Sequence, residues 1–123
     1  MYIKIFSKDN CPFCEKALFQ VMHFKKYLLN CYPAASPYVT EFDYVVYKLG
    51  DDFEMQDLVE LFPNARTFPQ ISCEWSAKEV NGKHVPSERE VIGGYDDLVP
   101  WLESSRQIVM KEQEEYKKKY NIQ

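Results

Sequence analysis

Cys11-Pro12-Phe13-Cys14 lies between two segments whose patterns indicate a strand followed by a helix. The segment before it, Tyr2-Ile3-Lys4-Ile5-Phe6, alternates its side chains in the manner of a strand. After it, apolar residues recur at intervals of three and four as far as Leu29, and Pro12 favours the start of a helix. We therefore expect an amphipathic helix over 12–29, with Cys11 at the junction between the strand and the helix.

Three further segments are rich in β-branched and aromatic residues and predict strands, namely 42–48, 70–75 and 90–92. The last two should form an extended hairpin, whose connection contains the turn signal Asn81-Gly82. A long loop is expected over 30–40, where two prolines interrupt the chain.

Apolar residues at helical spacing predict two further helices. The first runs through Met55 to Phe62, and we expect Asp51 or Asp52 to cap it and Pro63 to end it. The second begins at Asp96 or Asp97 and continues into a charged tail. Three apolar residues recur every seven positions in this last helix and predict that it packs on its own domain: Leu102, Val109 and Tyr116.

This order of elements predicts an α/β fold with a mixed four-stranded sheet, flanked by three or more helices. A chain of 123 residues is the size of one domain. We assign residues 1–105 to that domain and residues 106–123 to a C-terminal helical extension that is not a separate domain.

Composition narrows the class of function. A net charge of -4 argues against a nucleic-acid-binding protein, which usually has a basic face. No segment approaches the ~20 apolar residues of a membrane helix, and the N-terminus lacks a secretory signal. We therefore expect a cytoplasmic protein, in which a close cysteine pair is typical of redox or metal chemistry.

The spacing of the cysteines favours redox chemistry. Two intervening residues place Cys14 one helical turn from Cys11, so that the pair can close a disulfide. The helix N-terminus and Lys8 would favour the thiolate of Cys11, leaving Cys14 as the resolving thiol. A zinc site would need a second ligand pair, and its candidates are scattered: Cys31, Cys73, His23 and His84. We expect no metal, and packing roles for both Cys31 and Cys73.

Three separated motifs resemble those of the glutaredoxin branch of the thioredoxin-like proteins, over about residues 1–105. They are Lys8-Asp9-Asn10-Cys11-Pro12-Phe13-Cys14, Arg66-Thr67-Phe68-Pro69-Gln70 and Gly93-Gly94-Tyr95-Asp96-Asp97-Leu98. The resemblance implies a thioredoxin-like fold, a cis peptide bond at Pro69, and Cys11 and Cys14 as the catalytic residues. Phe13 and Phe68 depart from the tyrosine and valine that are usual in the family.

The same resemblance implies glutathione as the reducing co-substrate. Lys8 and Arg66 would hold its glycine carboxylate. Its γ-glutamyl carboxylate would lie at the amides of Tyr95 and Asp96, and Asp97 would pair with its ammonium group. The remaining residues implied in the glutathione surface are Phe13, Thr67, Phe68, Pro69 and Gly94.

The implied partners are glutathione and disulfide-containing client proteins, with ribonucleotide reductase as one candidate acceptor for a monomeric enzyme. Two alternatives stay open. Some relatives hold an iron–sulfur cluster between two subunits, although Pro12 and the presence of Cys14 argue against that role. A thioredoxin-like protein served by a reductase would use the same cysteine pair without glutathione.

Overall fold

Six strands and three helices follow one another in the part of the chain that the computed structural model describes, residues 1–31, 42–74, 78–80, 83–85 and 88–120. In order they are β1 (Tyr2–Ser7), α1 (Pro12–Leu29), β2 (Asp43–Lys48), α3 (Met55–Leu61), β3 (Gln70–Glu74), β4 (Lys78–Val80), β5 (Lys83–Val85), β6 (Arg89–Gly93) and α4 (Tyr95–Lys119). The helix expected over 12–29 is thus confirmed. Most of the expected 30–40 loop and the Asn81-Gly82 turn lie outside the described residues.

The main sheet has the strand order β2-β1-β3-β6. Strand β1 pairs in parallel with β2 and antiparallel with β3, which in turn pairs antiparallel with β6. The short strands β4 and β5 form a separate antiparallel ribbon within the connection between β3 and β6. This is a mixed four-stranded α/β sheet with a thioredoxin-like strand order, as the sequence predicted.

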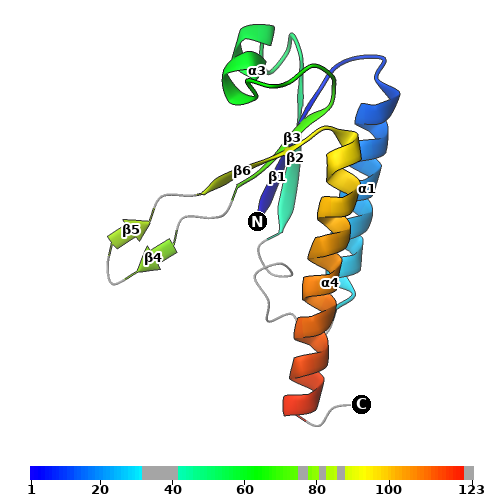
Figure 1. Cartoon of the computed structure of the whole chain (residues 1–123), viewed down its shortest axis with the longest axis vertical. Coiled ribbons are helices and arrows are strands. Elements are labelled where there is room, and N and C mark those ends of the chain that lie inside the picture. The colour runs from blue at the N-terminus through cyan, green and yellow to red at the C-terminus, as the bar shows by residue number, and fades with distance from the viewer. Residues whose placement is uncertain (32–41, 75–77, 81–82, 86–87, 121–123) are drawn as a thin grey trace.

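Helices cover the two faces of the sheet unequally (Figure 1). Helices α1 and α4 lie side by side along one face, where α1 buries Ala17, Val21, Phe24 and Leu28 against the main core. The core residues of the sheet on that face are Ile3, Ile5, Ile71 and Cys73. Helix α3 packs near one end of the sheet, over a smaller cluster formed by Phe6, Phe53, Leu58 and Phe62.

The register of the antiparallel strands brings three loops to the same edge. Phe6, near the end of β1, lies opposite Gln70, the first residue of β3. Ile71 lies opposite Gly93, the last residue of β6. The segment entering α1, the segment entering β3 and the start of α4 therefore all meet at this edge of the sheet.

Helix caps differ from the prediction at both later helices. The N-cap of α3 is Glu54, and its backbone N–H donates to Asp57 at 2.8 Å. The expected cap at Asp51 or Asp52 is wrong, because Asp52 instead accepts from the Lys48 N–H at 2.8 Å in the preceding turn.

At α4 the N-cap is Gly94, and neither Asp96 nor Asp97 holds that position. Asp97 instead accepts the Gly94 N–H at 3.0 Å from within the first turn. Its carboxylate therefore satisfies a donor that the helix leaves unpaired.

Helix α4 runs without interruption into the charged tail. Leu102 and Val109 are buried in the main core, so the tail's first turns pack on the domain as expected. Pro100 lies inside the helix and removes the N–H that would reach the carbonyl of Asp96, an exposed position where water can replace it. No helix among the described residues is long and apolar enough to cross a membrane.

Gly93 offers a test of this arrangement. It has a φ of +115°, and a Cβ atom there would collide with the Asp97 carboxylate that caps α4. We expect Gly93→Ala to lower the free energy of unfolding by about 2–3 kcal/mol, measured by urea denaturation. Gly50→Ala is the matched control, since Gly50 has a φ of +92° with nothing within 4 Å of the added atom. It should cost about 1 kcal/mol, and equal losses would contradict the role of the contact.

Candidate active site

Cys11 and Cys14 form a disulfide at the N-terminus of α1. Cys11 is the N-cap, with extended backbone angles, and its Sγ accepts the Cys14 N–H at 3.2 Å. The Cα atoms are 5.2 Å apart, and the two residues are only 7% and 6% exposed. A helix N–H that points at Sγ favours negative charge on that sulfur, which is what an attacking cysteine requires.

The loop before Cys11 is held by contacts on two sides. Asp9 pairs with Lys48 of β2 at 2.8 Å, and this carboxylate raises the pKa of Lys48. Asn10 adopts a φ of +53°, a left-handed conformation that asparagine tolerates better than most residues. Lys8 contacts the second motif, with its Nζ 5.3 Å from the centre of the Phe68 ring. The cation expected beside the cysteines is therefore placed against the second motif.

The second motif forms the turn that enters β3. Its Phe68-Pro69 bond is cis, as the resemblance implied, and Pro69 is fully buried. The buried Gln70 amide donates from Nε2 to the Thr67 carbonyl at 2.8 Å and closes the turn. The Phe68 ring stacks on that of Phe53 with ring centres 6.4 Å apart, so Phe68 joins the turn to the smaller aromatic cluster.

The third motif forms the first turn of α4 and lies against the other two. A Cβ atom on Gly94 would lie 3.7 Å from the Pro69 carbonyl oxygen, in ordinary contact. The Tyr95 ring lies 5.7 Å from the ring of Phe13, the residue between the two cysteines. The structure thus brings together three segments that the sequence separates by 51 and 22 residues.

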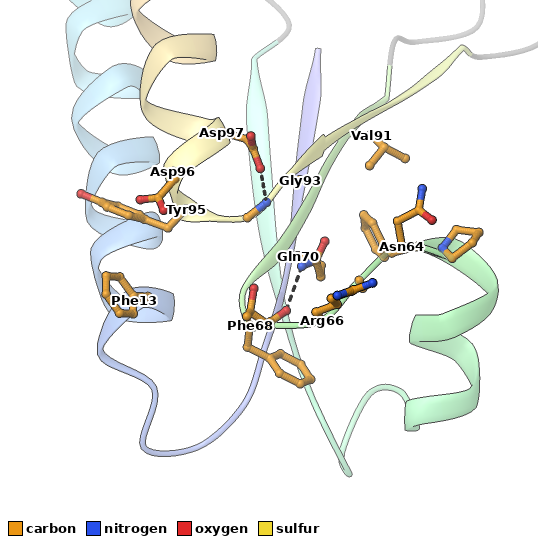
Figure 2. A pocket seen from close by; sticks show the side chains of 15 residues that line it. Phe13, Asn64, Arg66, Phe68, Gln70, Val91, Gly93, Tyr95, Asp96 and Asp97 are labelled. Carbon is orange, nitrogen blue, oxygen red and sulfur yellow. Dashed lines mark hydrogen bonds between the residues drawn. The ribbon is translucent and has the colours of Figure 1, made fainter.

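A groove of about 580 Å³ runs between these segments. Its lining includes eight of the residues that the resemblance implied for glutathione: Phe13, Arg66, Thr67, Phe68, Gly94, Tyr95, Asp96 and Asp97. Figure 2 shows Phe13, Tyr95 and Asp96 at one end of it. Lys8 and Pro69 are not part of the lining, and neither cysteine is; Phe13 is what connects the disulfide loop to the groove.

The site residues expected from the sequence did not include the other residues of the lining, which are Phe62, Pro63, Asn64, Ala65, Gln70, Val91 and Gly93. Gln70 and Gly93 do stand within the second and third motifs. One signal was present, because 62–65 directly precede Arg66 in the chain. Val91 lies two residues before the third motif, but its place in the groove depends on the pairing of β6 with β3.

Cys73, Cys31 and His23 each contact neighbouring groups of the fold. Cys73 is completely buried in the main core, and burial raises its pKa to about 12. Cys31 is half-buried and donates from Sγ to the Tyr27 carbonyl at 3.3 Å. His23 packs on Phe19 with ring centres 4.4 Å apart. Within the described residues, no three histidine, cysteine or acidic side chains gather in a way that could hold a metal ion.

Comparisons of the chain with protein-family models, with curated proteins and with solved structures found no match. The fold and the site together define a class: a thioredoxin-like domain whose Cys-x-x-Cys disulfide indicates a thiol–disulfide redox role. The glutaredoxin resemblance within that class rests on the three motifs.

The state of Cys73 gives a prediction about thiol reactivity. A pKa raised to about 12 keeps this thiol protonated at pH 8, and burial shields it from reagents. After reduction of the native protein, iodoacetamide at pH 8 should modify Cys11 and leave Cys73 unmodified, as read by peptide mass spectrometry. Protein unfolded in urea is the control and should be modified at both. Equal labelling rates of Cys11 and Cys73 in the native protein would contradict a buried, protonated Cys73 thiol.

Proposed function

We propose that this protein is a glutathione-dependent thiol–disulfide oxidoreductase of the glutaredoxin type. The observation that carries the proposal is the groove, in which the loop of the Cys11–Cys14 disulfide meets Arg66–Phe68 and the first turn of α4. A redox pair beside a groove of mixed charge is suited to a small charged thiol.

The charges of the groove match those of glutathione, which has two carboxylates and one ammonium group. Arg66 lines the groove, and Lys8 lies over the ring of Phe68, so both cations can hold the glycine carboxylate. The unpaired N–H groups at the start of α4 suit the γ-glutamyl carboxylate. Asp97 uses Oδ2 to accept the Gly94 N–H, and its second oxygen can pair with the ammonium group.

Reduction of a client disulfide would proceed in two exchanges. The Cys11 thiolate attacks one client sulfur, forming a mixed disulfide, and the second client sulfur leaves and takes up a proton. Cys14 then gives up its proton and attacks the Cys11 sulfur, releasing the first client sulfur as a thiol. The client gains two electrons and two protons, and the protein is left with its Cys11–Cys14 disulfide.

Glutathione would restore the dithiol. One glutathione thiolate attacks Cys11 and displaces Cys14, and a second attacks the bound glutathione sulfur, leaving as glutathione disulfide. A glutathione mixed disulfide needs only Cys11, because attack on the glutathione sulfur releases the client thiol directly. Disulfide-containing proteins are the proposed clients, and the resemblance makes ribonucleotide reductase one acceptor to assay.

Separate substitutions of the two cysteines test this mechanism. Cys11→Ser should abolish turnover of glutathionyl-cysteamine in an assay coupled to glutathione reductase, because it removes the nucleophile. Cys14→Ser should retain that turnover and lose the reduction of protein disulfides. Full activity of Cys11→Ser would refute the proposal, and so would faster turnover of the wild type with thioredoxin reductase than with glutathione.

Asp97 allows binding to be separated from helix capping. Asp97→Asn keeps an oxygen that can accept the Gly94 N–H but removes the charge, so the KM for glutathione should rise about fivefold with little loss of stability. Asp97→Ala should raise the KM similarly and also lower the free energy of unfolding by about 1 kcal/mol. Steady-state kinetics and urea denaturation measure the two effects. An unchanged KM in both variants would remove Asp97 from the glutathione site.

A further inference from the structure

The groove continues beyond the residues that account for glutathione. Five of the lining residues make up this continuation, which we call the distal half: Phe62, Pro63, Asn64, Ala65 and Val91. Figure 2 shows Asn64 and Val91 at the end opposite Phe13 and Tyr95, with Arg66 between the two ends. The glutathione half contains Arg66, Asp96 and Asp97, whereas none of the charged side chains that the structure describes lines the distal half.

The walls of the distal half are firmly held. Phe62 is almost completely buried, and its ring packs edge-on against Phe6 at 5.3 Å. The guanidinium of Arg89 lies 4.9 Å from the centre of the Phe62 ring and donates to the Leu61 carbonyl at 2.9 Å. Strand β6 is thereby joined to the end of α3, so the wall exists before any ligand arrives.

Val91 is an exposed aliphatic residue of this half. It lies on β6, an edge strand of the main sheet, and is 49% exposed. The pairing of β3 with β6 shifts between Ile71 and Ser72, which lie opposite Gly93 and Val91. Ile92 is therefore the extra residue of a bulge and packs against the main core, while Val91 lines the groove.

We propose that the distal half binds an apolar side chain of a client polypeptide while the client is joined to Cys11. The inference rests on the Cys11 chemistry proposed above and adds the class of client. Its basis is continuity: one groove leads from Phe13, in the disulfide loop, to an apolar end lined by Phe62 and Val91. A polypeptide attached through its cysteine can follow that groove, and burying an apolar side chain at its end stabilises the complex.

The step concerned is the first exchange with a protein disulfide. The Cys11–client sulfur bond forms, the client disulfide breaks, and the departing client sulfur takes up a proton. During this step Cys11 is joined to a client sulfur and not to glutathione, so the client polypeptide can lie along the whole groove. The distal half therefore acts in the reduction of protein disulfides and not in the exchange with glutathione mixed disulfides.

The test uses a single turnover and needs no glutathione. Pre-reduced protein is mixed with peptides that contain an internal Cys-x-x-Cys disulfide, with leucine or serine at successive positions beside the cysteines. Acid quenching and chromatography then give the rate of peptide reduction. For one of these positions, we expect the wild type to reduce the leucine peptide about tenfold faster than the peptide with serine at the same position. Equal rates at every position would overturn the inference.

Two valines on opposite edge strands provide the variant and its control. Val91→Glu should abolish the preference for leucine, because it places a charge in the apolar end. Val46→Glu should retain the preference, since Val46 is 37% exposed on β2 and does not line the groove. The inference is wrong if the preference survives Val91→Glu or is lost equally in Val46→Glu.

Turnover of glutathionyl-cysteamine is measured on the same preparations. Wild-type protein that prefers leucine peptides but does not turn over with glutathione would refute the proposed glutathione dependence alone. Protein that turns over with glutathione but has no leucine preference would refute the distal site alone. Val46→Glu, whose residue lies outside the groove, should turn over glutathionyl-cysteamine at the wild-type rate.

Discussion

The antiparallel pairing of β3 with both of its neighbours is the constraint on which the rest of the structure depends. Phe6 opposite Gln70 and Ile71 opposite Gly93 bring the ends of three strands to one edge. A one-residue slip in either register would turn the side chains of a strand to the wrong face and expose the core residue Ile71. The core therefore enforces the same alignment that places the three motifs around one groove.

The two hydrophobic clusters on opposite faces of the sheet position different parts of the site. The larger one holds α1 and α4 and so fixes the two helix N-termini that face the redox edge. The smaller one, around Phe6 and Phe53, packs against two residues of the groove lining, Phe62 and Phe68, and so holds that wall in place. The phenylalanine at position 68 has a local partner, since Phe53 provides the surface on which it packs.

Features that depend on local sequence were predictable, and features that depend on long-range pairing were not. Pro12 and the apolar spacing fixed the limits of α1, and three local motifs indicated the site. The caps at Glu54 and Gly94 were missed because aspartates near a helix start have competing partners, as Asp52 does with the Lys48 N–H. Val91 was missed although the third motif begins two residues later, because the bulge at Ile92 and the pairing with β3 decide which side chain of this strand lines the groove.

The N-cap residue of α1 is Cys11, and the sulfur atom that accepts its capping hydrogen bond also takes part in the proposed reaction. The chemical state of this sulfur therefore affects the first turn of the helix. A neutral sulfur is a weak hydrogen-bond acceptor, whereas a thiolate accepts strongly. The Cys14 N–H is therefore held more tightly when Cys11 is a free thiolate than when its sulfur is bonded to another. Because the same helix buries Val21 and Phe24 in the core, each change of sulfur partner alters how firmly the domain's central helix is anchored at its first turn.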